Sequence, residues 1–275
     1  MNPGLRALTA ADLPALLALI DPQPARHCFV EARLGGGSLA GVDLWGYFSD
    51  SGRLDSALLV GANVVPIESH AASRAAFADR LRRTGRRGSS LVGPAPEVLD
   101  LWRLLEPSWG PAREVRDRQP LLVISAEPAV AADPGVRAVR SDEIDVLLPA
   151  CIAMFTEEVG VSPVAGGSGS AYRARIAEIV REGRAFARIE DGAVVFKAEI
   201  GAVSERACQV QGVWVDPRMR GRGLSVPGMA AVVALSRRTC SPRVSLYVND
   251  FNTAARKAYE KVGFAEVDTF ATVLF

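Results

Sequence analysis

Val210-Gln-Gly-Val-Trp-Val-Asp-Pro-Arg-Met-Arg-Gly-Arg-Gly-Leu-Ser225 is the stretch that decides the fold. Its apolar run Val213-Trp214-Val215 is typical of a buried strand end, and Asp216-Pro217 ends the strand because proline cannot donate to a sheet ladder. A glycine-rich turn follows, Arg220-Gly221-Arg222-Gly223-Leu224-Ser225, and residues 226–238 have the apolar density of a helix. A strand, a glycine turn and a helix in this order form an anion-binding device, because free N–H groups and the helix dipole attract a phosphate.

Three kinds of phosphate loop share this geometry. A Walker loop needs Gly-Lys-Ser/Thr, and a dinucleotide fingerprint needs three glycines at a fixed spacing with an acidic residue about 20 positions on. The sequence fits neither. Arg220-x-x-Gly223-x-Ser225 instead resembles the Arg/Gln-x-x-Gly-x-Gly/Ala pyrophosphate loop of the GNAT superfamily of acyl-CoA N-acyltransferases. Ser225 departs from the usual Gly or Ala, but serine keeps its backbone N–H and adds a hydroxyl.

A second block supports the resemblance. Asn252-Thr-Ala-Ala-Arg-Lys-Ala-Tyr-Glu-Lys-Val-Gly-Phe264 is similar to the superfamily's Asn-x-x-Ala-x-x-x-Tyr-x-x-x-Gly-Phe helix. It follows the loop at the expected distance, with a predicted strand at residues 244–248 between the two. Each motif alone is weak, and the two in order are specific.

Composition excludes several classes of protein. The 275 residues are 49% hydrophobic and 23% charged, as in a soluble globular protein, with a net charge of +1 that argues against a nucleic-acid or membrane surface as principal partner. No apolar run is long enough to span a membrane, and the first residues lack a secretory signal, so we expect a cytoplasmic location. Cys28, Cys151, Cys208 and Cys240 are scattered without metal-like spacing, so we expect reduced cysteines and no metal.

The two halves of the chain begin alike, which predicts a duplicated domain. Residues 5–17 align with residues 136–148 at an offset of 131, and at the same offset Gly35-Gly36 meets Gly166-Gly167. We therefore predict a degenerate GNAT-like N-terminal domain at residues 1–125, a linker at 126–135 and a catalytic GNAT domain at 136–275. The resemblance implies an α/β (α+β) fold, with two GNAT-like domains that each have a mixed, mostly antiparallel sheet flanked by helices.

The expected elements follow this plan. In the first half we expect strands at 45–49, 56–66 and 89–92 and helices at 71–83 and 97–105. In the second half we expect strands at 136–140, 185–189, 193–203 and 207–215, and helices at 142–158, capped by Ser141, and at 172–181. Residues 161–170 are glycine-rich and read as a loop. Only about one closing strand, from Ala265, fits before the end of the sequence, and the first half is a candidate for what completes that edge.

The phosphate loop has no counterpart in the first half. The aligned position holds Val64-Val-Pro-Ile-Glu-Ser69, which has no glycine and places Glu68 where it would repel a phosphate. The first half therefore reads as a copy that no longer binds coenzyme A.

The resemblance implies how the second half would hold acetyl-CoA. The backbone N–H groups of Arg220, Gly221, Arg222, Gly223, Leu224 and Ser225 would bind the pyrophosphate, and the main chain of Val213, Trp214 and Val215 would pair with the pantetheine arm. An N–H of that strand end would face the oxyanion. Asn252 and Ala255 belong to the second motif, in which Asn252 would bind the pantetheine arm and Arg256 or Lys257 would meet nucleotide phosphates.

Two residues are candidates for proton transfer. Tyr259 stands at the position of the superfamily's proton donor to the thiolate, although a core-packing tyrosine fits the same pattern. Glu199, in the middle of a strand, could face the cleft, have a raised pKa and take the amine proton through water. Gln209 occupies the position where some relatives carry a base, and Glu157 and Glu158 border the expected acceptor site.

The resulting hypothesis is an acetyl-CoA-dependent N-acetyltransferase acting on an amine. A non-catalytic acyl-CoA sensor is the alternative, and a nucleic-acid-binding regulator lacks a basic patch. The sequence leaves the acceptor, the acyl chain length and any oligomer open.

Overall fold

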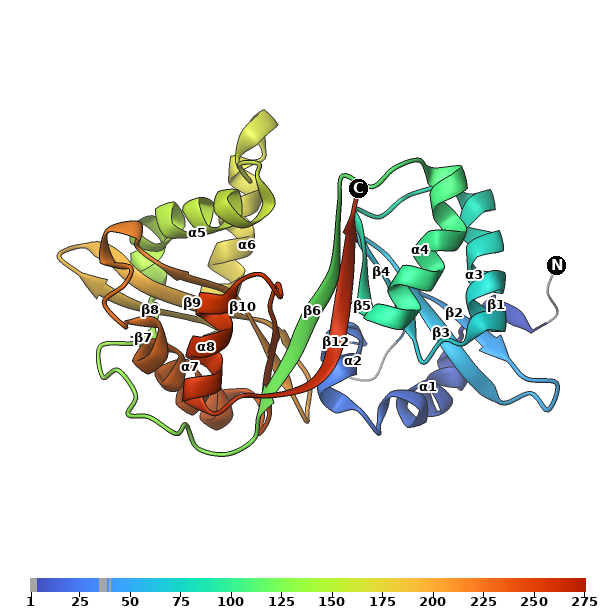
Figure 1. The fold of residues 1–275 in the computed structure, drawn as a ribbon, viewed down its shortest axis with the longest axis horizontal. Coiled ribbons are helices and arrows are strands. Elements are labelled where there is room, and N and C mark those ends of the chain that lie inside the picture. The colour runs from blue at the N-terminus through green and yellow to red at the C-terminus, as the bar shows by residue number, and fades with distance from the viewer. Residues whose placement is uncertain (1–3, 35–38, 40) are drawn as a thin grey trace. The chain divides into compact units, whose positions relative to one another are not determined.

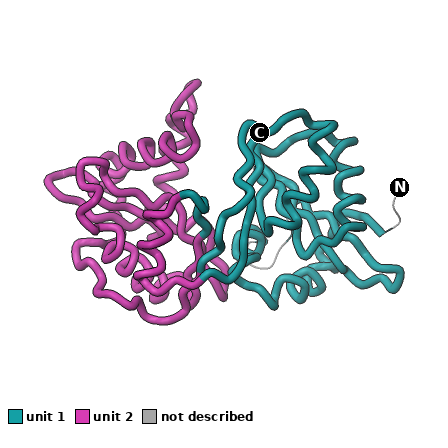
Figure 2. Tube along the Cα trace, in the orientation of Figure 1, with its two compact units in different colours: residues 1–122, 247–251, 266–275 teal, residues 123–246, 252–265 magenta. Residues whose placement is uncertain are grey.

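The computed structural model describes residues 4–34, 39 and 41–275, so Gly35 and Gly36 of the repeat lie outside the described residues. The chain divides into two compact units (Figure 2). Unit 1 comprises residues 1–122, 247–251 and 266–275, and unit 2 comprises residues 123–246 and 252–265.

Unit 1 is a mixed sheet with helices on it (Figure 1). Its strands follow the order β1-β2-β3-β4-β5-β12-β6, in which β4 and β5 pair in parallel and the pairs from β1 to β4 and between β5 and β12 are antiparallel. The strands are β1 (Leu5–Ala7), β2 (Asp43–Phe48), β3 (Leu54–Val60), β4 (Asn63–Ile67), β5 (Ser90–Pro94), β6 (Glu114–Ile124) and β12 (Ala265–Leu274). The helices are α1 (Leu13–Ile20), α2 (Pro24–Arg33), α3 (Ala71–Thr84) and α4 (Ala95–Trp109), with a 3-10 turn at Ala10–Asp12.

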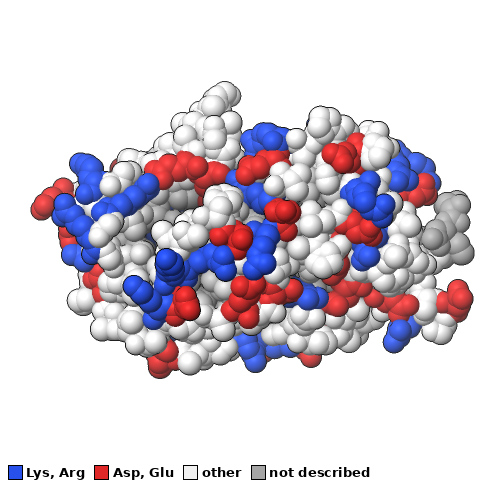
Figure 3. Space-filling model, viewed as in Figure 1, with Lys and Arg blue, Asp and Glu red and all other residues white. Residues whose placement is uncertain are grey.

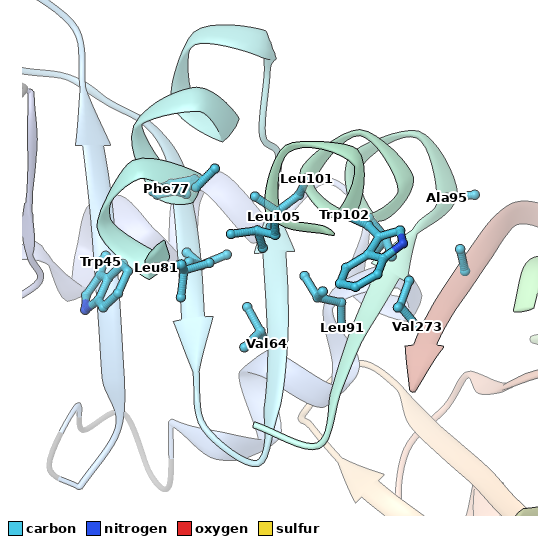
Figure 4. Packing of buried hydrophobic residues seen from close by; sticks show 14 residues of the cluster. Trp45, Val64, Phe77, Leu81, Leu91, Ala95, Leu101, Trp102, Leu105 and Val273 are labelled. Carbon is cyan, nitrogen blue, oxygen red and sulfur yellow. The ribbon is translucent and has the colours of Figure 1, made fainter. Parts of the chain in front are cut away.

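The core of unit 1 lies between the sheet and the helices α3 and α4 (Figure 4). Phe77 of α3 and Trp102 of α4 meet Leu91 of β5 and Val273 of β12 in one cluster of buried side chains. The last strand of the chain therefore completes the core built by the first half.

Unit 2 is also a mixed sheet with helices, and its strands follow the order β11-β10-β9-β8-β7. The pairs β10–β9, β9–β8 and β8–β7 are antiparallel, and β10–β11 is parallel. The strands are β7 (Arg137–Ala138), β8 (Ala185–Glu190), β9 (Ala193–Val203), β10 (Cys208–Val215) and β11 (Val244–Tyr247). The helices are α5 (Ile144–Val159), α6 (Gly169–Arg181), α7 (Ser225–Thr239) and α8 (Thr253–Val262), with 3-10 turns at Ser141–Glu143, Ala165–Gly167 and Pro217–Met219. The predicted fold class, a mixed and mostly antiparallel sheet with helices in each half, is confirmed.

Most predicted elements are present, and local contacts explain those that differ. The strand expected over 56–66 is two strands, because the chain turns at Gly61–Ala62 and β3 pairs back onto β4. Helix α2 was not expected, and the strand expected at 136–140 shrinks to β7. Ser141 does not cap α5; the carboxylate of Glu143 accepts the Arg140 N–H at 2.9 Å instead.

The linker is not a free segment. Within unit 2 the Ala129 N–H donates to the Val262 carbonyl, and the Asp133 N–H donates to the Pro227 carbonyl. The Asp133 carboxylate also pairs with Arg188 at 2.8 Å. These bonds attach the linker to α7, α8 and β8.

The packing places the end of the chain in unit 1, whereas a division at the predicted linker would place it in the second domain. Phe270 to Leu274 of β12 pair with β5, because that edge of the first-half sheet needs a strand. Residues 266–275 thus belong to unit 1, although they lie within the predicted catalytic domain at 136–275. The domain division at 126–135 stays a prediction.

Candidate functional site

A bulge interrupts β10 where it approaches the glycine loop. Gln211 pairs with Glu199 and Trp214 pairs with Lys197, so β10 carries one residue more than β9 between these two pairs. Such an extra residue leaves the ladder and turns backbone N–H groups away from the neighbouring strand. Gly212, within the bulge, has φ +60°, a conformation that favours glycine.

β10 also has an open side beyond the bulge. It pairs with β11 at Cys208–Val244 and Gln209–Ser245, and the two strands share no further pair within the described part of the chain. Val210 to Val215 therefore present main-chain groups on the side where β11 has separated. An extended ligand with amide groups could pair with this edge in the manner of an added strand.

The predicted phosphate loop forms a strand-turn-helix joint. Asp216 ends β10 and accepts the Arg218 N–H at 2.9 Å, the chain turns through Pro217–Met219, and α7 begins at Ser225. Gly221 and Gly223 have φ +76° and +77°, and a Cβ at either would meet no atom within 4 Å. Backbone conformation, not crowding, is therefore what requires glycine at both positions.

The arginines of the loop differ in their partners. Arg220 donates from Nε to the Val215 carbonyl at 3.1 Å and from Nη2 to Glu157 of α5 at 2.6 Å. Arg218 is paired with Asp216. Arg222 is exposed, and its side chain makes no hydrogen bond or ion pair to another described residue. Arg222 is thus the loop cation available to an anion.

Glu157 connects three elements at this joint. One carboxylate oxygen accepts from the Trp214 indole N–H at 3.2 Å, and the other accepts from Arg220. The last turn of α5 is thereby bonded to the end of β10 and to the first residue of the loop. This positioning contact was not predicted, because the chain separates Glu157 from Arg220 by 63 residues.

The second motif forms α8. Asn252 caps the helix, and its Oδ1 accepts the backbone N–H of Ala255 at 3.2 Å, which explains the asparagine at the first position of the motif. Tyr259 is 6% exposed, and its ring meets the edge of Phe264. Burial, and then the charge of Glu158, raise the pKa of Tyr259, so its hydroxyl keeps its proton at neutral pH.

Glu199 lies in a buried polar cluster and not in an open cleft. Its carboxylate accepts from Gln211 Nε2 at 2.9 Å and pairs with Lys197 Nζ at 3.3 Å. Lys197 is 1% exposed and also contacts Cys151 Sγ at 3.4 Å. Burial, the largest single influence, lowers the pKa of Lys197, but Glu199 and Cys151 together raise it by more, so the net shift is upward. Burial raises the pKa of the Cys151 thiol, which is therefore protonated.

The cluster sits directly behind the bulge. A Cβ on Gly212 would lie 3.0 Å from Met154 Cε, 3.2 Å from Lys197 Nζ and 3.3 Å from the Glu199 carboxyl carbon. The structure thus places Glu199 beside the Gly212 bulge, together with Lys197 and Met154, which the sequence did not single out. A lone glycine inside an apolar strand is a known signal for a bulge, and Gly212 offered it.

The joint in unit 1 that corresponds to the phosphate loop is already occupied by a side chain of the protein. Between β4 and α3, the Ser69 N–H and hydroxyl both donate to Glu97, at 2.6 and 2.7 Å. Glu97 is buried, and burial raises its pKa despite these bonds. Glu68, with φ +49°, bonds to His27 and Arg26. A protein carboxylate therefore occupies donors that would face a phosphate in a working loop.

The remaining surface features do not indicate a particular ligand or partner. A groove of about 640 Å³ in unit 2 lies beside α5, the β8–β9 turn and the strand end, and is lined in part by Pro149, Val194 and Trp214. Basic and acidic side chains are interspersed over the face seen in Figure 3, which gives no extended field of one sign there. No described helix is long and apolar enough to cross a membrane, and the described residues contain no cluster of His, Cys, Asp and Glu suited to a metal.

Comparisons with known proteins agree with this geometry. Residues 157–264 match the acetyltransferase (GNAT) family, and residues 42–147 match a domain of unknown function, DUF4081. No curated protein matches the chain.

Solved structures resemble the chain over its whole length. A GCN5-related N-acetyltransferase from Sphaerobacter thermophilus has a TM-score of 0.62 at 15% identity, covering 98% of this chain and 93% of that one. A GNAT-family acetyltransferase from Colwellia psychrerythraea has a TM-score of 0.59 at 10% identity, with coverages of 98% and 99%. A tandem GNAT protein from the clavulanic acid biosynthesis pathway has a TM-score of 0.58 at 16% identity, covering 98% of each chain.

At these identities the likeness concerns the fold, and it extends through both halves. The family matches identify the two segments. The chain carries an acetyltransferase (GNAT) family domain at residues 157–264, preceded by a DUF4081 domain at residues 42–147, and its fold is that of tandem GNAT proteins.

Proposed function

We propose that this protein is an acetyl-CoA-dependent N-acetyltransferase, which transfers the acetyl group directly from the thioester to a primary amine. The observation that carries the proposal is the bulged strand β10, whose open edge leads into a glycine loop at the start of α7. An extended pantetheine arm and a pyrophosphate are joined in the same order in coenzyme A. The GNAT family match over this segment supports the assignment.

The loop and α8 supply the groups that would hold the coenzyme. The backbone N–H groups of residues 221–225 would bind the pyrophosphate at the positive end of the α7 dipole, whereas the Arg220 N–H already donates to the Pro217 carbonyl. The Arg222 guanidinium would add a charge-assisted bond to a phosphate. Asn252 uses its Oδ1 for the α8 cap, which leaves its amide nitrogen for the pantetheine arm, and Arg256 lies one turn further along the helix.

The chemistry needs one bond formed and one broken. The neutral amine nitrogen attacks the thioester carbon, the oxyanion is stabilised by N–H groups released at the Gly212 bulge, and the C–S bond breaks as the C–N bond is completed. We propose that Tyr259 protonates the departing thiolate and that Glu199 receives the amine proton through water. Gln211 and Lys197 hold the Glu199 carboxylate in one orientation beside the bulge.

Unit 1 would not bind a second coenzyme. Glu97 already accepts from the donors at the β4–α3 joint, and a phosphate there would meet two carboxylates, those of Glu68 and Glu97. We expect one coenzyme site per chain.

Calorimetric titration of acetyl-CoA tests the proposal. We expect one site per chain in the wild type and no binding heat in Gly223→Glu, because the new carboxylate repels the pyrophosphate. Gly52→Glu is the matched control: Gly52 has φ +79° and a Cβ there meets no atom within 4 Å, as at Gly223. Both variants carry the same backbone strain, so only a loop role predicts a difference between them.

Two results would count against the proposal. Absence of binding in the wild type would rule out the acetyl-CoA site, and equal loss in both variants would trace the effect to strain. A non-catalytic acyl-CoA sensor is the second candidate, favoured by the engagement of Glu199 in an ion pair. It predicts binding without release of free thiol in the presence of any amine.

A further inference from the structure

We propose that Met154 and the Lys197–Glu199 pair form a closed wall behind the bulge, here called the acyl wall, which limits the transferred group to acetyl. The inference rests on the proposed function, because it concerns the acyl end of the coenzyme at the Gly212 bulge. It adds what determines the size of the acyl group.

The side chains of the acyl wall lie close to Gly212. All three of its members approach within 3.0–3.3 Å of the place where a Cβ on Gly212 would stand, which leaves no room for one methyl group without a shift. The side chains come from α5 and from β9, which form one packed cluster with Cys151 and Trp214. A chain that extended from the thioester carbon toward α5 would have to displace them.

The opposite face of the sheet is filled as well. Phe196 of β9, which pairs with Val215, packs against α7 so tightly that a Cβ on Gly228 would lie 2.9 Å from its ring. An acyl tail therefore finds no space behind β9 and β10 on the α7 side at the strand end.

The chemistry of the wall also disfavours longer acyl groups. Lys197 is satisfied by Glu199 and Cys151, and Glu199 is satisfied by Gln211 and Lys197. An apolar tail that separated these groups would leave a buried charge without its partner, which is costly. Because the two charges offset each other, the wall also offers no net attraction to an acyl carboxylate.

Met154 is the residue of the acyl wall that can be truncated in a test. It is uncharged and flexible, so its truncation enlarges the space without leaving a charge unpaired. Lys197 and Glu199 cannot be removed singly without that consequence.

The test compares the affinities of CoA, acetyl-CoA and butyryl-CoA by calorimetry, so no acceptor is needed. We expect wild-type protein to bind butyryl-CoA, whose acyl chain is two methylenes longer, at least roughly tenfold more weakly than acetyl-CoA, because a single misfitting methylene in a pocket costs roughly ten- to two-hundredfold. In Met154→Ala the butyryl-to-acetyl ratio of dissociation constants should fall about tenfold.

Leu147→Ala is the matched control. Leu147 lies two turns earlier on α5 in the same buried cluster, so it loses similar apolar volume without touching the bulge. Its ratio should equal the wild-type ratio.

The outcomes are separable. If free CoA does not bind, the proposed function fails. If CoA binds but acetyl- and butyryl-CoA bind equally well to the wild type, the acyl wall is overturned while the coenzyme site stands. Equal ratios in Met154→Ala and Leu147→Ala would also overturn the role of Met154.

Discussion

Tyr259 and Glu199 occupy different surroundings, and these surroundings set what each side chain can do. Tyr259 is buried against Phe264, and its raised pKa keeps the proton on the hydroxyl, as a donor requires. Glu199 is held by one ammonium and one amide, with a side chain 8% exposed. Its geometry is fixed before any acceptor arrives.

Conservative substitutions at these two residues should lower turnover without lowering affinity for the coenzyme. Tyr259→Phe keeps the ring packing and removes only the hydroxyl. Glu199→Gln keeps the shape and removes the base, but it also leaves the buried Lys197 ammonium without its charged partner, so its stability is measured beside its kcat. We expect each to reduce kcat for thiol release about 10²–10⁴-fold, the usual contribution of a proton-transfer group, with an unchanged Kd for acetyl-CoA.

Measurement needs an amine panel with a thiol-detecting reagent, and calorimetry for Kd. Tyr47→Phe, an aromatic position in unit 1, is the control. Unchanged kcat in Tyr259→Phe would mean that this tyrosine only packs in the core. Unchanged kcat in Glu199→Gln would leave the pair with Lys197 as a structural contact.

Helix α5 shows how an element is fixed at both ends by residues that also bear on the site. At its start, Glu143 accepts two bonds from Arg137 and one from the Arg140 N–H. At its end, Glu157 bonds Trp214 and Arg220. Met154, between them, reaches the bulge. The position of this one helix therefore couples the loop, the strand end and the acyl wall.

The start of α5 should make stability depend on pH. The bonds from Arg137 lower the pKa of Glu143 from 4.5 to about 2. A carboxyl with a lowered native-state pKa stabilises the fold above its unfolded-state pKa, and that contribution is lost as pH falls from about 4.5 to about 2. Glu143→Gln should therefore lower the free energy of unfolding at pH 7 by about 1–3 kcal/mol.

Urea unfolding at pH 7, 5, 4 and 3 checks this prediction. The difference between wild type and Glu143→Gln should shrink as the pH falls through the last three values. Glu178→Gln, in an exposed pair on α6, serves as control and should show a small difference at every pH. A Glu143→Gln difference that stays constant with pH would contradict the prediction.

At the scale of the whole molecule, the C-terminal strand packs with the first half of the chain. β12 lies between β5 and β6 in the unit 1 sheet, and it places Ala271 and Val273 in the core with Leu91 and Trp102. The first half therefore holds a sheet that is complete only when residues 266–275 are present.

Truncation after Ala265 should selectively loosen unit 1. The variant loses five strand pairs with β5 and three buried apolar side chains, those of Phe270, Ala271 and Val273. Hydrogen exchange followed by mass spectrometry should show β5 amides losing protection while β9 amides keep theirs. Val267→Ser, at an exposed position of the same strand, should leave both unchanged, and retained protection of β5 in the truncated chain would refute the argument.

The sequence alone determined the elements whose causes are local. The glycine loop with its two positive φ values, the helix after it and the strands β9 and β10 follow from residues near one another in the chain. Their turn chemistry and apolar spacing act over a few positions. The fold class itself was implied by the resemblance that the two motifs carry.

Tertiary structure decided what depends on residues far apart. The pairing of Glu157 with Arg220, the burial of Lys197 against Cys151, the closure of Gly212 by Met154 and the pairing of β12 with β5 all join distant segments. A charged residue in a strand reads as solvated until its neighbours are known, because burial and partner choice are properties of packing. For the same reason the sequence could nominate Glu199, but only the fold showed the ammonium beside it.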